Sequence, residues 1–127
     1  MSYTYDDQNV FAKILRGEIP NKTFLETEHA LAFEDIAPQA PIHILVIPKG
    51  PYVNYDHFAN AASDEEIVGF TRAIGQVCEK LGVQPSHDGM GYRATANTGD
   101  AGVQEVPHLH IHILSGRVLG RMIPKGS

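Results

Sequence analysis

The chain has 127 residues, of which 43% are hydrophobic and 20% are charged, a balance typical of one soluble globular domain. Its formal net charge of −5 argues against a nucleic-acid partner, because nucleic-acid-binding surfaces are normally basic. A single cysteine excludes an internal disulfide, and no apolar run suits a signal peptide or a membrane span, so we expect a cytoplasmic protein without a membrane partner.

The N-terminal part of the chain predicts a polar arm, a short helix and two strands. Residues 1–8 are mostly polar, and we expect them to form a mobile arm. Asn9 can cap a helix whose apolar residues recur at helical spacing, and Gly17 is placed to end it. Strand-forming residues then predict strands over 23–26 and 29–34, joined by a tight turn.

An acidic residue and a histidine stand out in the next segment. Asp35 comes between the second strand and a proline-stiffened loop, a common place for a ligand contact, although it could simply cap the turn. Residues 42–49 are mainly apolar and predict a buried central strand. His43 interrupts that run, and a lone histidine in such a place is more often a hydrogen-bonded core residue than a functional one.

The middle of the chain predicts a loop followed by the main helix. Residues 50–62 contain several aromatic side chains, which we interpret as packing residues of a loop. Ser63 and Glu66 have the spacing of a capping box, and an apolar stripe follows them. Gly82 is placed to end this helix. The stripe predicts core packing or a dimer contact.

A further strand and a turn precede the last motif. Residues 91–97 predict a strand, and residues 98–102 predict a flexible glycine-containing turn. Asn97 lies at the junction, where it could serve the turn or a ligand. The next segment contains Gln104 and Glu105, whose side chains lie close enough in sequence to reach a group bound at the histidines that follow.

Residues 108–114 read His-Leu-His-Ile-His-Ile-Leu, an alternation of histidine and apolar residues. A period of two predicts a strand with one buried face. The predicted core-facing residues are Leu109, Ile111 and Ile113, and the residues of the opposite face are His108, His110 and His112. Same-face side chains lie about 7 Å apart along a strand, so one extended ligand could touch all three rings.

Three interpretations of this histidine row remain open from the residues alone. The rings could form a solvated strand face, or they could bind a metal such as zinc, for which neutral imidazole is a good ligand. They could also form a catalytic row, in which one ring is a nucleophile and the others move protons or contact a phosphate.

The pattern His-x-His-x-His-x-x, with x apolar, resembles the defining motif of the histidine triad (HIT) superfamily of nucleotide hydrolases and transferases. The run Asn-Val-Phe-Ala-Lys-Ile-Leu-Arg-Gly-Glu-Ile-Pro over residues 9–20 resembles the N-terminal segment of its HINT branch. The segment Ala-Pro-Ile-His-Ile-Leu-Val-Ile-Pro-Lys over residues 40–49 is similar to a second family segment. The resemblance covers the chain from about Asn9 to Arg117.

This resemblance implies an α+β, HIT-like fold. The family has an antiparallel sheet of about five strands with one long and one short helix. Residues 1–127 would form a single HIT domain, with residues 118–127 as a C-terminal tail. The family also implies a homodimer in which the sheet extends across the two subunits.

The resemblance assigns roles to particular residues. His110 would attack the α-phosphorus, His112 would stabilise charge on the phosphoryl oxygens, and His108 would orient the row or move the leaving-group proton. His43 would support the row as a fourth active-site histidine. The residues expected to bind the nucleotide are Asp35 at the ribose, Asn97 at the phosphate and sugar, and Ile36, Gln104, Glu105, Val106, His110 and His112.

The implied reaction is hydrolysis of purine nucleoside 5′-phosphoramidates, such as adenosine 5′-phosphoramidate or an AMP–lysine conjugate, through a covalent nucleotidyl-histidine intermediate. No metal or other cofactor is then expected. The alternatives are a dinucleoside polyphosphate hydrolase, a nucleotide-binding or regulatory protein with incidental catalysis, and a metal-dependent hydrolase.

The chain departs from the family pattern at two positions. Glu105 stands where many animal HINT proteins have a serine that is thought to act near the leaving group, so we expect proton delivery to differ here. Ser115 replaces the first glycine of the usual Gly-Gly-Arg, a change that we expect the fold to tolerate.

Overall fold

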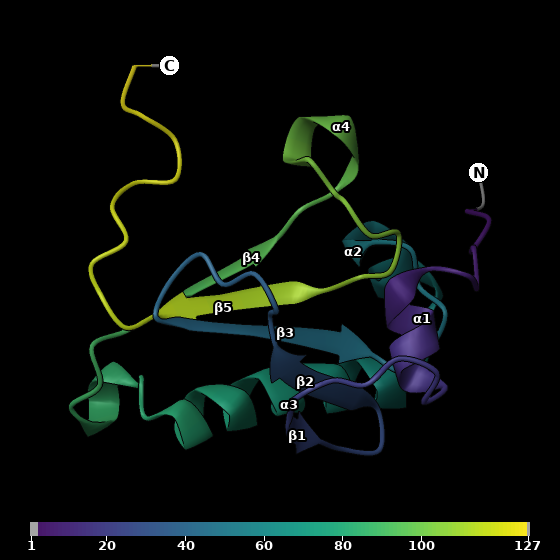
Figure 1. The fold of residues 1–127 in the computed structure, drawn as a ribbon, viewed down its shortest axis with the longest axis horizontal. Coiled ribbons are helices and arrows are strands. Elements are labelled where there is room, and N and C mark those ends of the chain that lie inside the picture. The colour runs from purple at the N-terminus through teal and green to yellow at the C-terminus, as the bar shows by residue number, and fades with distance from the viewer. Residues whose placement is uncertain (1–2, 127) are drawn as a thin grey trace.

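Five antiparallel strands form one sheet in the computed structural model, which describes residues 3–126 (Figure 1). The strands are β1 (Thr23–Glu26), β2 (Ala30–Glu34), β3 (Ile42–Pro48), β4 (Arg93–Ala96) and β5 (Ile111–Ser115). They lie in the order β1-β2-β3-β5-β4, so the last strand in the chain lies between β3 and β4. This sheet confirms the predicted α+β class and the predicted number of strands.

Four helical segments and one 3₁₀ turn accompany the sheet in the described residues. They are α1 (Val10–Leu15), α2 (Tyr55–Ala61), α3 (Asp64–Leu81), the single turn α4 (Gly99–Gly102) and the 3₁₀ turn Pro85–His87. The side chain of Asn9 accepts the N–H of Ala12 and so caps α1 as predicted. Ser63 and Glu66 form the predicted capping box of α3, and Gly82 ends that helix in the left-handed conformation.

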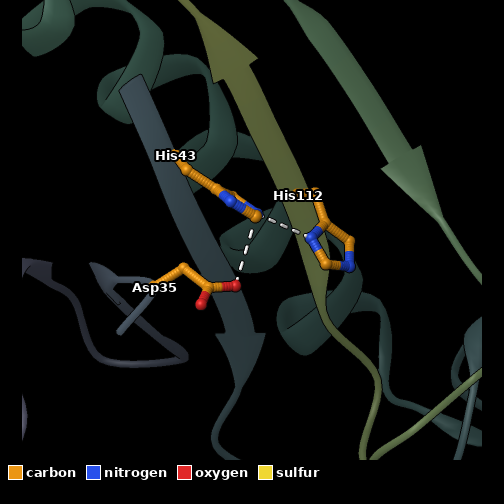
Figure 2. Close-up of side chains that lie close together, drawn as sticks. All are labelled: Asp35, His43 and His112. Carbon is orange, nitrogen blue, oxygen red and sulfur yellow. Dashed lines mark hydrogen bonds and ion pairs between the residues drawn. The ribbon is translucent and has the colours of Figure 1, made fainter. Parts of the chain in front are cut away.

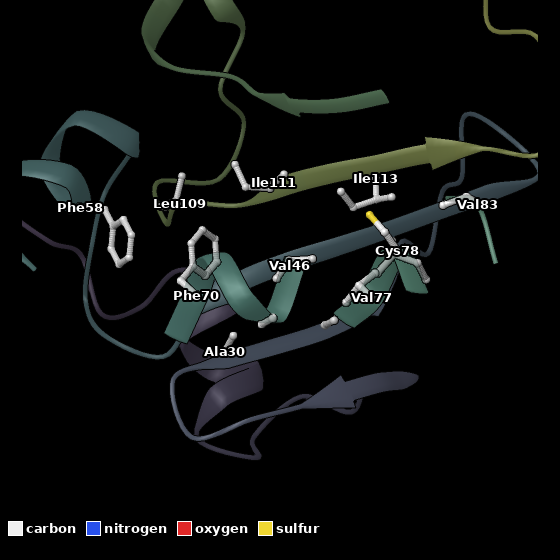
Figure 3. Packing of buried hydrophobic residues seen from close by; sticks show 13 residues of the cluster. Ala30, Val46, Phe58, Phe70, Val77, Cys78, Val83, Leu109, Ile111 and Ile113 are labelled. Carbon is white, nitrogen blue, oxygen red and sulfur yellow. The ribbon is translucent and has the colours of Figure 1, made fainter. Parts of the chain in front are cut away.

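Both faces of the central strands are buried, each in a different cluster. The residues that face α3 are Ala30, Ala32, Ile44, Val46, Ile111 and Ile113, and they pack with Phe70, Val77 and Cys78 of the helix (Figure 3). The residues on the opposite face are Leu31, Phe33, Leu45 and Ile47, which pack with Phe11 of α1. The alternation along β2 and β3 therefore sends successive side chains into separate cores. The histidines lie on the α1 side of the sheet.

The prediction of a loop over residues 50–62 is wrong, because α2 occupies most of its second half. Asn54 caps this helix by accepting the N–H of His57 at 2.9 Å, and Phe58 anchors it in the core. The single turn α4 likewise lies within residues 98–102, which were predicted as a flexible turn. Both segments are too short to show a helical apolar stripe in the sequence.

The predicted strand over the histidine row is also too long at its start. β5 begins at Ile111, so only His112 of the three histidines lies within the strand. The neighbouring strand β3 ends at Pro48, and Pro107 lies directly before the histidine row. Because proline has no backbone N–H, neither residue can donate a hydrogen bond that would extend the sheet in this region. The backbone around His108 and His110 is therefore positioned by other contacts.

The N-terminal residues that the structure describes lie against the body of the protein. The hydroxyl of Tyr3 donates to Asp56 of α2 at 2.6 Å. Met1 and Ser2 of the predicted mobile arm, and Ser127 of the predicted tail, lie outside the described residues, and the mobility of the arm stays a prediction.

Among residues 3–126, no helix combines the length and the apolar character that a membrane crossing needs.

Candidate active site

His110 lies directly before β5 with only 7% of its surface exposed. Its Nδ1 is 2.7 Å from the backbone carbonyl oxygen of His108. A carbonyl oxygen can only accept, so Nδ1 carries the proton and Nε2 has the free lone pair. The ring of Phe11 packs edge-on against this imidazole, with centroids 5.0 Å apart. The site thus holds His110 in the tautomer that a nucleophile requires.

A chain of hydrogen bonds holds His112 in the tautomer opposite to that of His110 (Figure 2). The backbone N–H of Gln39 donates to Nδ1 of His43 at 3.1 Å, so the proton of the neutral His43 ring is on Nε2. That Nε2 donates to Nδ1 of His112 at 2.9 Å, and it also lies 3.4 Å from Oδ2 of Asp35. Because Nδ1 of His112 accepts, its Nε2 carries a proton.

The two rings therefore present complementary groups. Nε2 of His112 is buried and has no hydrogen-bond partner within residues 3–126. A buried donor without a partner is costly, so this N–H is suited to an acceptor that a ligand brings. His110 and His112 line the same two cavities, with ring centroids 5.0 Å apart. A lone pair and an N–H donor next to each other suit attack on a phosphorus whose oxygens need stabilisation.

Burial keeps these imidazoles neutral. Burial lowers the pKa of His110 below its ordinary value. The hydrogen bond to the His108 carbonyl and the charges of Asp35 and Glu105 act in the other direction and raise this pKa, but their effect is smaller. Burial, together with the neighbouring imidazoles, lowers the pKa of His112 to about 4. Burial also lowers the pKa of His43, against the charge of Asp35. Each ring is therefore in its neutral form near neutral pH, as the hydrogen-bond pattern requires.

His108 does not share the expected common face with the other two rings. It is completely buried, and Nε2 donates to the backbone carbonyl of Pro48 at 2.8 Å. Its Nδ1 is 2.6 Å from the hydroxyl oxygen of Tyr5. Burial lowers the pKa of His108 to about 4. One ligand can reach His110 and His112 but not this ring, because both nitrogens of His108 have protein partners.

A cavity of about 410 Å³ opens in front of His110 and His112, on the α1 side of the sheet. Most of its wall is apolar and comes from α1, from β2 and β3, and from the loops that follow α1 and β2, with Val10, Phe11, Ile14, Ile19, Phe33, Ile36 and Leu45. Its polar residues include Asp35, at the end of β2, and Glu105. An apolar pocket of this size with a few convergent polar groups is typical of a small-molecule site.

A second cavity of about 190 Å³ adjoins the same two histidines. Its other walls are formed by Gln39, Asn97, Gly102, Val103 and Glu105. Glu105 lines both cavities, as the two histidines do. A ligand that reacts at His110 can therefore place one part in the apolar cavity and another part in the more polar one.

The residues predicted to contact a nucleotide are mostly found on these walls. Asp35, Ile36 and Val106 line the larger cavity, Asn97 lines the smaller one, and Glu105 lines both. Gln104 differs, because its Nε2 donates to the backbone carbonyls of Val53 and Val106 and so ties two loops together. The side chain of Ile36 is fully exposed at the rim, where it is free to contact a bound ring.

Sequence reasoning missed three contributors to the site. Tyr5 belongs to the predicted mobile arm, and its contact with His108 spans 103 residues of sequence. Gln39 acts through its backbone N–H, which no side-chain motif reveals. Phe11 was predicted to lie on the apolar stripe of α1, but the sequence did not show that this stripe forms a wall of the cavity.

Asp35, His43 and His112 could also form a metal site, since one ligand atom from each lies within 4.8 Å of the others. In the structure the facing nitrogens of His43 and His112 are 2.9 Å apart and share one proton in a hydrogen bond. A metal would have to replace that proton and break the bond, since only a nitrogen lone pair ligates. The trio thus fits the hydrogen-bonded arrangement better than metal ligation.

A comparison with family models gives a match to the HIT domain over residues 16–119, most of the chain. The chain is also 59% identical over 126 residues to a 13.2 kDa HIT-like protein of Azospirillum brasilense. That alignment covers 99% of this chain and 100% of the relative.

Two solved structures have the same fold. A histidine triad protein from Clostridium difficile superposes with a TM-score of 0.79 at 34% identity, covering 93% of this chain and 98% of that one. A HIT family hydrolase from Legionella pneumophila superposes with a TM-score of 0.74 at 37% identity, covering 85% of this chain and 92% of that one.

Proposed function

The chain belongs to the HIT family, and on that basis we propose that it hydrolyses purine nucleoside 5′-phosphoramidates, such as adenosine 5′-phosphoramidate or an AMP–lysine conjugate, to the nucleoside monophosphate. The observation that carries this proposal is the pair of opposite tautomers at one cavity, with a lone pair on Nε2 of His110 and an N–H on Nε2 of His112. The solved neighbours that are HIT family hydrolases support the reaction class.

The larger cavity suits the nucleoside. Its apolar wall, with Phe11 and Ile14 from α1, can pack against a purine ring. Asp35 lies at the end of β2, and its Oδ1 already accepts the N–H of Ala37 at 2.8 Å. A carboxylate has further acceptor sites and can take bonds from the two adjacent hydroxyls of a ribose. The α-phosphate would then lie between His110 and His112.

The reaction proceeds in two displacements. Nε2 of His110 attacks the α-phosphorus, a bond forms between that nitrogen and phosphorus, and the bond from phosphorus to the leaving amine breaks as the amine takes a proton from solvent water, which the second displacement returns. The N–H of His112 donates to a phosphoryl oxygen whose negative charge grows in the transition state. Water then attacks the phosphorus of the nucleotidyl-histidine, releases the monophosphate and restores the lone pair on His110.

The leaving amine would depart through the smaller cavity. Asn97 and Glu105 line that cavity together with the two histidines. A carboxylate at this place stabilises positive charge on a departing amine, which becomes an ammonium ion in water. The charged Glu105 would therefore act on the leaving amine electrostatically, which the neutral hydroxyl of a serine at this position cannot do.

The test measures release of AMP from adenosine 5′-phosphoramidate with EDTA present. We expect wild-type protein to release AMP and His110→Ala to lose several orders of magnitude in turnover, as for other lost nucleophiles. His112→Ala should lower kcat on the order of 100-fold or more, the usual effect of removing one transition-state donor. His87→Ala is the matched control, because this exposed histidine lies in the 3₁₀ turn outside both cavities.

Two results would contradict this proposal. Activity that is lost in EDTA and restored by zinc would assign Asp35, His43 and His112 to a metal. Binding of AMP without release from any phosphoramidate would favour a nucleotide-binding protein, and diadenosine polyphosphates would then be the next substrates to assay.

A further inference from the structure

We propose that Tyr5 is a positioning residue for the nucleophile, acting through the imidazole of His108 to hold the backbone carbonyl that orients His110. Its catalytic consequence rests on the proposed function above, whereas its effect on the His110 ring does not. The contact comes from a part of the chain that sequence reasoning assigned to a mobile arm.

The hydrogen bonds fix which group donates. Nε2 of His108 is 2.8 Å from the carbonyl oxygen of Pro48, an acceptor, so Nε2 carries the proton of the neutral ring. Nδ1 of His108 is then an acceptor, and the hydroxyl of Tyr5 donates to it across 2.6 Å. His108 is completely buried. Without the Tyr5 hydroxyl its Nδ1 would lose the donor that satisfies it.

The backbone of His108 matters because it makes the bond that orients the nucleophile. Its carbonyl oxygen accepts the Nδ1–H of His110 at 2.7 Å. Both residues precede β5, so the pairing of the sheet does not position this peptide group. The same peptide group donates its Leu109 N–H to the carbonyl of Tyr52 at 2.8 Å, and the two ends of the His108 ring are anchored on Tyr5 and Pro48. A ring fixed at both ends adds to this backbone bond in holding the carbonyl that accepts the hydrogen bond from His110.

Aromatic packing adds to the same arrangement. The ring of Tyr5 meets His108 edge-on with centroids 5.6 Å apart. Phe11 contacts both His108 and His110, at 6.3 and 5.0 Å between centroids. Phenylalanine at position 5 would keep this packing and remove only the hydroxyl, so the substitution isolates the hydrogen bond.

Tyr3 offers a matched control within the same arm. Its hydroxyl also donates across 2.6 Å, but to the carboxylate of Asp56 on α2 and not to the histidine row. Tyr3→Phe therefore removes a tyrosine hydroxyl bond of the same length at the same end of the chain. An effect of Tyr5→Phe that Tyr3→Phe lacks reports on His108 and not on docking of the arm in general.

The first measurement compares kcat and KM for adenosine 5′-phosphoramidate at a temperature at which all three proteins are folded. We expect Tyr5→Phe to lower kcat about tenfold with KM within about twofold, because a tenfold change corresponds to about 1.36 kcal/mol of barrier, the scale of one net hydrogen bond. Tyr3→Phe should leave both constants unchanged. A lower melting temperature of Tyr5→Phe with unchanged kcat would overturn the proposal and make Tyr5 a purely structural residue.

The second measurement needs no substrate and follows the Nδ1–H proton of His110 by nitrogen-edited NMR. We expect its resonance to shift and its exchange with water to accelerate in Tyr5→Phe, and to stay unchanged in Tyr3→Phe. If wild type proves inactive on phosphoramidates, this resonance still decides whether Tyr5 positions His110. An identical resonance in wild type and Tyr5→Phe would overturn the inference whatever the substrate.

Discussion

At His110 and His112, the partner of Nδ1 decides which form of the ring faces the cavity. A backbone carbonyl holds a proton on Nδ1 of His110, whereas a donor imidazole leaves Nδ1 of His112 unprotonated. The same residue type thus supplies a nucleophile at one position and a hydrogen-bond donor at the next. This division of roles depends on both rings being neutral, which burial ensures.

The acid limb of the pH–rate profile follows from the state of His110. Attack requires an unprotonated Nε2, so kcat/KM should rise with pH through the pKa of His110 and then level off. Burial lowers that pKa, so we expect the midpoint of the limb below the ordinary value of about 6.5. The measurement is kcat/KM for adenosine 5′-phosphoramidate across the acidic range.

Replacement of Glu105 tests whether the acid limb reports the pKa of His110. The charge of Glu105 favours the protonated form of His110, so Glu105→Gln should lower the pKa further and move the acid limb to lower pH. Glu65→Gln in the first turn of α3 removes the same charge away from the cavities and should leave the limb in place. A limb that moves to higher pH in Glu105→Gln would contradict the assignment of His110.

Most of the individual site residues could be predicted from the sequence, but the geometry around His108 could not. The motif and the resemblance identified His43, His110 and His112, which the structure brings together. The full burial of His108 and its bond to Tyr5 could not be read from the sequence, because they depend on a contact between the two ends of the chain. Local patterns carry no information on such long-range contacts.

Among the elements, the ones with a clear period were predicted most closely. Strand-forming residues predict a strand over 29–34 and the mainly apolar run predicts a buried strand over 42–49, close to the observed Ala30–Glu34 and Ile42–Pro48, and both faces of the second strand are buried. The capping box at Ser63 likewise marks the start of α3. Helix α2 was missed because, in this short segment, only Phe58 is fully buried, so no apolar stripe shows in the sequence.

The end of β5 explains how the chain tolerates serine in place of the first glycine of the family's Gly-Gly-Arg. Ser115 is buried, and its hydroxyl donates to the carbonyl of Gly91 at 2.6 Å. Gly116 is the position that requires glycine, because its φ is +94° and an added Cβ would lie 2.7 Å from Cβ of Pro41. The fold therefore accepts a side chain at the first position and excludes one at the second.

This difference predicts the effect of alanine at Gly116. Gly116→Ala combines a left-handed backbone with a steric overlap, so we expect it to lower the free energy of unfolding by about 2 kcal/mol or more. Gly17→Ala is the matched control, because its φ is +78° but nothing lies within 4 Å of the added Cβ. Denaturant unfolding should show a clearly smaller loss for Gly17→Ala, and equal losses would show that the contact with Pro41 is unimportant.

For the whole molecule, the edge strand β4 is the feature that bears on assembly. Within residues 3–126, β4 pairs only with β5, and Ala94 and Ala96 of this strand are exposed. The helix α3 covers β1, β2 and β3. An edge strand left open in this way can pair with another copy. We propose that two subunits join here as a homodimer and extend the sheet, as the family resemblance implies.

A proline in the edge strand tests this assembly. Ala94→Pro and Thr95→Pro remove one backbone N–H each, at adjacent residues of β4 whose N–H groups point to opposite edges of the strand. One of them faces β5 and should weaken the fold, and the other faces outward and should weaken only the dimer. Sedimentation velocity and thermal unfolding of both variants distinguish the two effects. A wild-type chain that sediments as a monomer at micromolar concentration would contradict the proposed dimer.

The central claim is that His110 forms a covalent bond to phosphorus, and the configuration at phosphorus tests it most directly. The substrate is a single diastereomer of adenosine 5′-O-thiophosphoramidate, hydrolysed in isotopically labelled water. Each in-line displacement inverts the phosphorus, so attack by His110 followed by attack by water predicts overall retention. Overall inversion would mean that water displaces the amine in one step, and it would contradict a nucleophilic role for His110.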